Sequence, residues 1–294
     1  MTPVKISGKT GVVGIVGHPV AHTLSPEMHN AAFSALDLEL LYLPFDVPPD
    51  RLPAAVRGLA ALGARGFNVT IPHKEAVVPL LGELSEGAKR MGAVNTVEIR
   101  AEGLVGHNTD GPGFLRALRE DGGMEPLQRR VLIVGAGGSA RAVAVELALC
   151  GVKEIRIANR TPQRGRALCE TLQREFPGLS VRFVPTTATS SAEQWRQALE
   201  NIDLLVNATP VGLEGTEAAT PCPAEMISSG LFVADLVYRP LDTPLLEAAR
   251  SRHARTLSGL SMLLYQGAIA FEIWTGRGAP LAVMRQALTS AIRR

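Results

Sequence analysis

The segment from Val131 to Leu149 constrains the fold of this chain more than any other part of the sequence. Its first four residues are apolar and rich in valine and isoleucine, which is typical of a parallel strand buried on both faces. A glycine turn follows, and then an alanine- and leucine-rich segment with helical character. The order strand, G-x-G-x-x-A, helix is the dinucleotide-binding fingerprint.

Each small residue of the fingerprint has an expected task. Gly135 is expected to form the turn, Gly137 to let the backbone approach a pyrophosphate, and Ala140 to let the helix pack closely on the strand. The phosphates would then lie at the helix N-terminus. A glycine-rich turn that holds no ligand is the alternative that the motif alone leaves open.

The rest of the chain predicts an α/β fold with two domains. A length of 294 residues is enough for two cores. Residues 1–110 alternate strands and helices, with a helix expected to start at Ser25 as N-cap and another after the turn at 71–74. Asp110-Gly111-Pro112-Gly113 indicates a boundary, followed by a linking helix over 114–121 and a Rossmann-like, doubly wound unit up to about residue 260.

Composition limits the classes of partner. The formal net charge of +2 gives no electrostatic reason to expect nucleic acid or a membrane surface, and no apolar run reaches the ~18 residues of a membrane span. The three cysteines are scattered, and no histidine has the spacing of a metal ligand, so no metal is expected. Together with an N-terminus that lacks a signal-peptide core, these features predict a soluble, cytoplasmic protein. They leave both a monomer and a homodimer open.

The end of the second strand of the fingerprint unit indicates which cofactor is bound. An NAD site needs a carboxylate there to hold the ribose 2′-hydroxyl. This chain instead has Asn159-Arg160-Thr161, with Arg164 shortly after. Because arginine can neutralise a 2′-phosphate, and Arg160 could also stack on the adenine, we expect NADP rather than NAD. The alternative is that both arginines lie in solvent at the start of a helix and bind no phosphate.

Three strand-to-helix junctions could carry chemistry. Thr23 and Ser25 place hydroxyls beside a helix N-terminus, a natural seat for a carboxylate but also an ordinary cap. Lys74 follows the second junction and is one of only five lysines, although a surface lysine is the commoner explanation for any single one. Asp110, near the third, could be a turn residue.

Motifs along nearly the whole length resemble the shikimate dehydrogenase family. They occur in the family's order: H-T-L-S-P-E-M-H-N (22–30), N-V-T-I-P-H-K (68–74), G-A-V-N-T (92–96), N-T-D-G (108–111), G-A-G-G-S-A-R (135–141), N-R-T (159–161), N-A-T-P-V-G (207–212), D-L-V-Y-R-P-L-D-T-P-L-L (235–246) and G-L-S-M-L-L-Y-Q-G-A (259–268). The resemblance implies NADP-dependent interconversion of 3-dehydroshikimate and shikimate on the route to chorismate and aromatic amino acids. It also implies that helices in 261–294 complete a substrate-binding domain over 1–110, that 111–260 binds NADP, and that the substrate lies in the cleft between them.

The resemblance also assigns residue roles. Lys74 and Asp110 would form the catalytic pair. The substrate would be bound by Thr23, Ser25, Thr70, Asn95, Tyr238 and Gln266. The cofactor would be bound by Gly135, Ala136, Gly137, Gly138, Ser139, Ala140, Asn159, Arg160, Thr161, Arg164, Ala208, Thr209 and Gly259.

The sequence departs from the family pattern at two positions. Thr23 stands where the family most often has serine, and Ser261 replaces a usual glycine. The first departure keeps a quinate/shikimate dehydrogenase of broader specificity as an alternative. A nucleotide-sensing regulator without catalysis is the alternative from another class, and the presence of both Lys74 and Asp110 argues against it.

Overall fold

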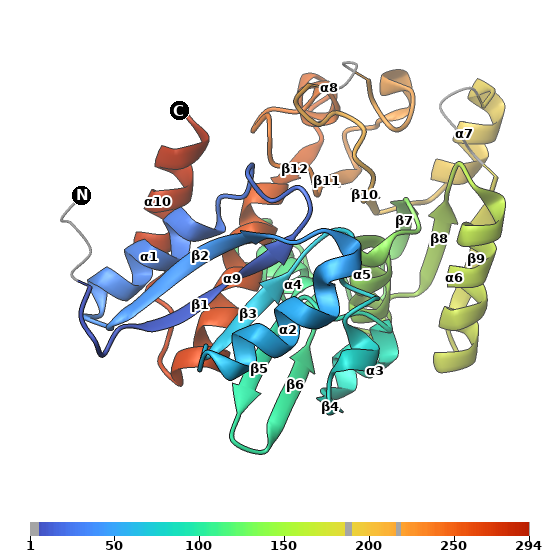
Figure 1. Ribbon diagram of the computed structural model, residues 1–294. Helices are drawn as coiled ribbons and strands as arrows, with labels where there is room; N and C mark the ends of the chain where they lie inside the picture. The colour runs from blue at the N-terminus through green and yellow to red at the C-terminus, as the bar shows by residue number, and fades with distance from the viewer. Residues whose placement is uncertain (1–5, 186–189, 216–218, 294) are drawn as a thin grey trace. The chain divides into compact units, whose positions relative to one another are not determined.

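The computed structural model describes residues 6–185, 190–215 and 219–293, which form two compact units (Figure 1). Unit 1 comprises Met1–Thr109 and Leu264–Arg294, and unit 2 comprises Asp110–Leu263. Helix α9 (Gly259–Thr275) begins in unit 2 and continues into unit 1. In the described part of the chain, no helix combines the length and the apolar character needed to cross a membrane.

Unit 1 is built on a mixed six-stranded sheet with the order β2-β1-β3-β5-β6-β4. β1 pairs in parallel with both β2 and β3, whereas β5 is antiparallel to its neighbours β3 and β6. The strands are β1 (Gly11–Gly17), β2 (Leu40–Asp46), β3 (Gly66–Val69), β4 (Glu83–Leu84), β5 (Thr96–Arg100) and β6 (Gly103–His107).

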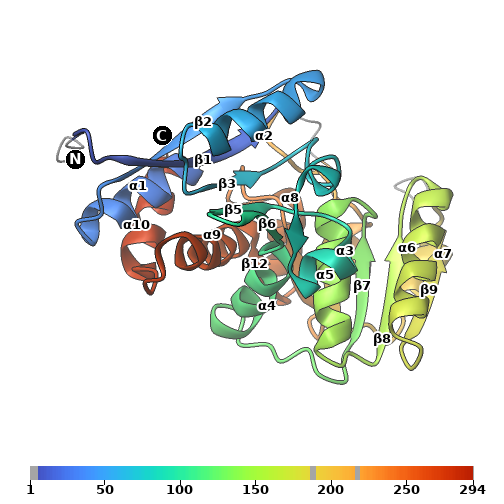
Figure 2. The same cartoon turned by 60° about the horizontal axis from the view of Figure 1, so that its bottom comes forward.

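Helices cover both faces of this sheet. Within unit 1, α2 (Leu52–Ala61) lies on one face, and α1 (Ser25–Ala35), α9 and α10 (Leu281–Ile292) lie on the other (Figure 2). Trp274 of α9 approaches the sheet so closely that a Cβ on Gly66 would lie 2.3 Å from its indole nitrogen. The same nitrogen donates a hydrogen bond to the Val97 carbonyl at 3.0 Å. Glycine at position 66 therefore lets the C-terminal helix dock on the N-terminal sheet.

Two expected helix starts in unit 1 are wrong in detail. Leu24, not Ser25, is the N-cap of α1, and Ser25 is its first helical residue. After residue 71 the chain forms turns and only a short 3₁₀ helix, Val78–Leu80, instead of an α-helix. Prolines at 72 and 79 disfavour helical geometry in the residues that precede them, so the intervening segment is too short for a stable helix.

Unit 2 is a doubly wound fold on an all-parallel sheet, which confirms the Rossmann-like prediction. The strand order is β12-β11-β10-β7-β8-β9, and the chain crosses from one side of β7 to the other between β9 and β10. The strands are β7 (Arg130–Val134), β8 (Glu154–Ala158), β9 (Ser180–Val184), β10 (Leu204–Asn207), β11 (Phe232–Asp235) and β12 (Arg255–Ser258). The fingerprint strand is thus central.

The helices of unit 2 include one that the sequence did not reveal. They are α4 (Asp110–Glu120), α5 (Gly138–Leu149), α6 (Pro162–Glu175), α7 (Ala192–Leu199) and α8 (Pro244–Ser251). α4 starts four residues before the expected linking helix. The unexpected helix, α7, is short and polar, and it is started by a capping box in which Ser191 and Gln194 satisfy each other's backbone N–H groups.

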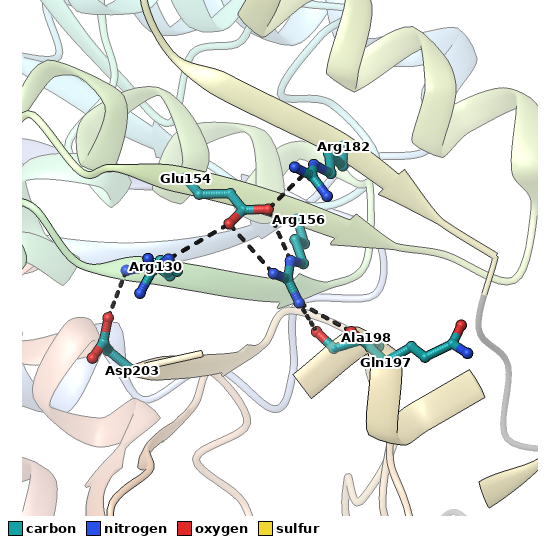
Figure 3. Close-up of polar contacts among 7 residues, drawn as sticks. All are labelled: Arg130, Glu154, Arg156, Arg182, Gln197, Ala198 and Asp203. Atoms are coloured by element: carbon teal, nitrogen blue, oxygen red, sulfur yellow. Dashed lines mark hydrogen bonds and ion pairs between the residues drawn. The ribbon is translucent and has the colours of Figure 1, made fainter. Parts of the chain in front are cut away.

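The far end of α7 is fixed by a buried arginine (Figure 3). Arg156 on β8 donates to the carbonyl oxygens of Gln197 and Ala198 at 3.1 and 2.9 Å, which are in the last turn of the helix. Its other nitrogens donate to the buried Glu154 carboxylate at 2.9 and 3.3 Å. Two further arginines, Arg182 and Arg130, lie 3.5 and 3.9 Å from that carboxylate.

Three cations around one carboxylate decide its protonation. Burial alone raises the pKa of Glu154, but the hydrogen bonds from Arg156 and the attraction of Arg156, Arg182 and Arg130 outweigh it. The net pKa of Glu154 therefore lies below its ordinary value. Glu154 stays ionised in the folded protein and links β7, β8 and β9, while Arg156 joins this cluster to α7.

We expect Arg156→Met to lower the free energy of unfolding by about 3 kcal/mol, because it leaves a buried carboxylate with weaker pairing and removes the donor at the end of α7. Urea unfolding measures this loss. The matched control is Arg196→Met, whose partner Glu193 is exposed, and which should cost about 0–1 kcal/mol.

The pH dependence gives a second check of the same prediction. Because the folded pKa of Glu154 is lowered, its contribution is complete above the unfolded pKa of about 4.3 and is lost as the pH falls through the folded pKa. The difference between wild type and Arg156→Met should therefore shrink below about pH 4. A difference that stays constant from pH 7 to pH 3 would contradict the role given to Glu154.

Candidate active site

The fingerprint turn has the geometry that its glycines predict. Gly135 follows β7 with a φ of +120°, and a Cβ there would lie 2.7 Å from the Ala208 carbonyl oxygen. Both facts require glycine, because a side chain would be strained and would collide with the neighbouring backbone. Gly137 is the N-cap of α5, and a Cβ there would meet nothing within 4 Å.

The start of α5 is therefore open to a ligand. Backbone N–H groups of the first helical turn, which includes Gly138, Ser139 and Ala140, point out of a helix N-terminus and favour an anion. Ala140 is fully buried. Ala136 lies between the two turn glycines, and the whole turn can accept a pyrophosphate.

The predicted 2′-phosphate residues follow the neighbouring strand. Asn159 and Arg160 come directly after β8, and the Asn159 amide donates to the carbonyl of Thr161 at 2.8 Å. Thr161 is the N-cap of α6, and Arg164 lies in its first turn. Both arginine side chains are exposed, so their guanidinium groups are available to a phosphate.

A hydrogen-bonded pair that the sequence did not single out organises the next two strand ends. Asn207 and Asp235 end β10 and β11, both are fully buried, and the Asn207 amide donates to the Asp235 carboxylate at 2.9 Å. Asp235 also accepts from the Val237 N–H at 3.0 Å and from the Thr243 hydroxyl at 2.6 Å. Burial raises the pKa of Asp235, and these hydrogen bonds act in the opposite direction.

This pair fixes the loops that carry three predicted site residues, Ala208, Thr209 and Tyr238. The Asn207 amide oxygen accepts from both the backbone and the hydroxyl of Thr209, at 3.1 and 2.7 Å, and Ala208 lies between them in sequence. Tyr238 follows the bound Val237 N–H in the next loop. Gly259 begins α9, where a Cβ would lie 2.4 Å from the Leu236 carbonyl oxygen. Each of these strands ends in a polar residue, and this pattern in the sequence could have identified Asn207 and Asp235.

In unit 1, Thr23 and Ser25 lie at the start of α1 and contact each other. The Thr23 hydroxyl donates to the Ser25 hydroxyl at 3.2 Å and accepts from the Ser25 N–H at 3.3 Å. Ser25 is buried and Thr23 half-buried. Two adjacent hydroxyls beside a helix N-terminus can bind a carboxylate.

Asn95 is the centre of a second polar group in unit 1. Its amide oxygen accepts from the Thr109 N–H at 2.7 Å and from the Thr96 hydroxyl at 3.1 Å. Its amide nitrogen donates to the Thr109 hydroxyl at 2.9 Å and to the Gln266 side-chain oxygen at 3.5 Å. The structure thus brings together Asn95 and Gln266, which are 171 residues apart. Thr96 and Thr109 were not predicted.

Lys74 and Thr70 lie close to this group along the backbone. The Lys74 carbonyl accepts from the N–H of Val94, the residue before Asn95, at 2.8 Å. Thr70 directly follows β3, and its N–H donates to the Val16 carbonyl at 2.9 Å. The Lys74 side chain is half-buried. The backbone of Lys74 therefore lies beside that of Asn95, and Lys74 belongs to a segment of turns instead of a helix.

Asp110 is the residue at which the chain leaves unit 1. It is the first residue of α4 and follows Thr109, whose backbone is held by Asn95. Chain connectivity alone therefore keeps the Asp110 backbone within one peptide bond of the Asn95 group. Tyr238, by contrast, belongs to unit 2, as do the residues predicted to bind the cofactor. Across the described residues, no group of three or more His, Cys, Asp or Glu side chains could hold a metal ion.

Family models match three parts of the chain. The model of the shikimate dehydrogenase substrate binding domain matches residues 15–97, that of shikimate / quinate 5-dehydrogenase matches 121–211, and that of the shikimate 5′-dehydrogenase C-terminal domain matches 259–289. A curated relative, the shikimate dehydrogenase (NADP⁺) of Methanopyrus kandleri, is 50% identical over 291 residues, covering 99% of each chain. The chain belongs to the shikimate dehydrogenase family.

Solved structures of this family have the same fold. Shikimate 5-dehydrogenase from Thermus thermophilus, in complex with NADP(H) and shikimate, superposes with a TM-score of 0.85 at 42% identity, covering 96% of this chain and 99% of that one. Quinate dehydrogenase from Corynebacterium glutamicum, in complex with NAD, has a TM-score of 0.86 at 31% identity, with coverage of 96% and 99%. The fold is thus shared by enzymes with different substrates and cofactors, so residues must decide both.

Proposed function

We propose that this protein catalyses the reversible, NADP-dependent reduction of 3-dehydroshikimate to shikimate, a step toward chorismate and the aromatic amino acids. One observation carries the proposal: the Asn95 group ties together the residues that this reaction needs. Gln266 bonds to Asn95, Lys74 starts beside it, and Asp110 follows Thr109, which Asn95 holds. The family membership of the chain and the open turn at Gly137 support the same conclusion.

In this proposal unit 1 recognises the substrate. Thr23 and Ser25 bind its carboxylate, and Thr70, Asn95 and Gln266 bind its hydroxyls, while Tyr238 contributes from unit 2. The adjacent hydroxyls at the start of α1 can donate hydrogen bonds to the carboxylate end of the substrate, and the amide groups around Asn95 can bind its hydroxyl end. An amide offers a donor and an acceptor, which suits a hydroxyl that is both.

The chemistry requires one proton for every hydride. NADPH, when bound, supplies the hydride that reduces the ketone. The Lys74 ammonium donates a proton to the oxygen of that ketone as negative charge develops on it, and the neutral amine takes the proton back from the shikimate hydroxyl in the reverse direction. Asp110 carries a carboxylate that orients the ammonium group toward the ketone. Lys74 and Asp110 thus act as the catalytic pair.

The residues of unit 2 fit NADP. The turn with Gly135, Ala136, Gly137, Gly138, Ser139 and Ala140 has room for a pyrophosphate at a helix N-terminus, because a Cβ at Gly137 would meet no atom within 4 Å. Arg160 and Arg164, beside Asn159 and Thr161, offer exposed guanidinium groups to the 2′-phosphate. Ala208, Thr209 and Gly259 lie at the ends of the strands on the other side of β7, where the nicotinamide half belongs in this fold.

We also propose that the enzyme is located in the cytoplasm. All three cysteines are free, as is usual in a reducing compartment, which supports the cytoplasm as its location. A direct test of the activity is to mix the protein with NADP and shikimate and to follow reduction of the nicotinamide by absorbance. Absence of reduction under conditions that sustain a known family member would refute the proposed function.

We expect Lys74→Ala to lower kcat by roughly 10²–10⁴-fold, because a positioned proton donor contributes about this much. NADP affinity, measured by fluorescence titration, should hardly change. Lys89→Ala is the matched control, since Lys89 is exposed and forms an ion pair with nearby Glu86 on the surface of α3 (Glu86–Met91). If Lys74→Ala retains a kcat near that of the control, the lysine has no part in proton transfer.

We expect NADP to be used far better than NAD, and Arg160→Asp to narrow or invert this ratio, because a carboxylate repels the 2′-phosphate and can hold a ribose hydroxyl. The ratio of kcat/KM for the two cofactors is the measurement. Arg166→Asp is the control, since Arg166 is also exposed on α6 but lies over the ring of Phe183. Equal use of both cofactors by the wild type would contradict the role of the arginines.

We expect the wild type to prefer shikimate over quinate by about ten- to hundredfold. Quinate carries an extra hydroxyl on the carbon that bears its carboxylate. Thr23 turns its own hydroxyl toward Ser25. If the extra hydroxyl of quinate faces the Thr23 methyl group, it loses water without gaining a hydrogen-bond partner, and an unpaired polar group costs ~1–3 kcal/mol. Thr23→Ser should therefore raise kcat/KM for quinate more than for shikimate. Equal use of both acids by the wild type would show that Thr23 does not discriminate.

A further inference from the structure

Tyr42, which no family motif above includes, connects the two polar groups of unit 1. It lies on β2 and is buried, and α1 holds it through two residues, His29 and Asn30. Asn30 bonds to its backbone twice, at 2.8 and 3.0 Å, and the ring of His29 stacks on its ring with centroids 4.5 Å apart and planes 7° apart. Tyr42 is thus fixed to α1, at whose start lie Thr23 and Ser25, the residues proposed to bind the substrate carboxylate.

His29 acts on Tyr42 by stacking. Burial lowers the pKa of His29 to about 3, so its ring is neutral at physiological pH. Among the described residues, neither of its ring nitrogens has a hydrogen-bond partner. The last two residues of the motif at 22–30, His29 and Asn30, therefore serve to fix Tyr42.

The hydroxyl of Tyr42 points to the other polar group. It donates to the Asn68 amide oxygen at 2.6 Å. The Asn68 amide nitrogen then donates to the Asn95 carbonyl at 3.1 Å and to the Thr96 hydroxyl at 2.9 Å. Thr96 in turn donates to the Asn95 side chain at 3.1 Å. An unbroken chain of hydrogen bonds therefore leads from Tyr42 to Asn95.

We propose that Tyr42 is a positioning residue that sets the geometry between the carboxylate-binding hydroxyls on α1 and the hydroxyl-binding amides around Asn95. The inference rests on the proposed function, which assigns these two groups to opposite ends of one substrate. A rigid ligand such as shikimate engages both ends at once. Its affinity therefore depends on their relative position more than the affinity of a ligand that engages one end.

The phenol hydroxyl is the part of Tyr42 that carries this role. Because one Tyr42 donor occupies the Asn68 oxygen and two acceptors occupy the Asn68 nitrogen, the amide has a single satisfied orientation. Burial raises the pKa of Tyr42, so the hydroxyl remains a donor. Removing it leaves a buried amide oxygen unpaired, and Asn68 no longer holds Thr96 and Asn95 in one arrangement.

The test is Tyr42→Phe, which keeps the ring on His29 and removes only the hydroxyl. We expect KM for shikimate to rise about tenfold, the effect of one unpaired buried group. The kcat should change by less than about threefold and KM for NADP should not change, as when binding alone is lost. Tyr265→Phe is the control, because it removes a phenol hydroxyl that is equally buried in unit 1 and bonds to Arg285 at 3.1 Å.

A second readout separates positioning from general damage. Cyclohex-1-ene-1-carboxylate has the ring and carboxylate of shikimate without its hydroxyls, so it engages only the Thr23 and Ser25 end. Its inhibition constant should be the same for wild type and Tyr42→Phe. Thr96→Val breaks the same chain one step further on and should also raise KM for shikimate. Combined with Tyr42→Phe, it should raise KM by less than the product of the two single effects.

The outcomes are distinct. If the wild type does not oxidise shikimate with NADP, the proposed function fails and this inference fails with it. If the wild type is active but Tyr42→Phe has an unchanged KM for shikimate, or loses cofactor and analogue binding equally, only the inference on Tyr42 is overturned. Should Tyr42→Phe not fold, Thr96→Val decides, and an unchanged KM for shikimate in that variant overturns the inference.

Discussion

The pairing of buried amide and hydroxyl groups determines the geometry at the centre of unit 1. Tyr42, Asn68, Thr96 and Asn95 are nearly fully buried, and each would be costly without a hydrogen-bond partner. They satisfy one another, and their only satisfied arrangement fixes β2, β3 and β5 with respect to the turn before α4. Because the chain enters α4 directly from Thr109, the same hydrogen bonds fix where Asp110 begins. The proposed substrate site is therefore held in one arrangement by the protein's own hydrogen bonds.

Unit 2 meets the same requirement at the ends of its strands. Asp235 is fully buried, and three neutral donors stabilise its carboxylate. Through Asn207 it also determines how the chain passes Thr209. The carboxyl ends of parallel strands lie at one edge, so loops held there converge on the region where this fold binds its ligand. The Glu154 cluster has no such task, and it stabilises β8 and α7.

Close backbone approaches are the second constraint. Glycine at 135 allows the fingerprint turn, and glycine at 66 allows Trp274 to dock on β3. A third case is Gly267, where a Cβ would lie 2.1 Å from the Met28 side chain. Because Gly267 follows Gln266, this approach of α9 to α1 also brings Gln266 to the Asn95 group. Small residues therefore decide which distant segments can share a site.

The sequence by itself determined the local elements and the cofactor chemistry. The alternation of apolar strands and helices, the G-x-G-x-x-A turn and the arginines after β8 depend on neighbours in the chain, and short-range sterics and turn chemistry suffice to read them. Motif order also identified the family, and with it most of the proposed site residues. Local patterns failed where two prolines shortened the segment after residue 71 and where a polar helix, α7, depends on its caps.

Only the tertiary structure decided which polar residues pair. From the sequence, Tyr42 is predicted only to be one residue of a strand, and Asn68 is only one residue of a family motif. Their bond joins residues 26 positions apart, and Asn95 reaches Gln266 across 171. Such pairings leave no periodic signal, because they arise only when the order of strands and the docking of the last helices bring the segments together. The physical reason is that a buried donor requires an acceptor nearby in space, wherever that acceptor lies along the chain.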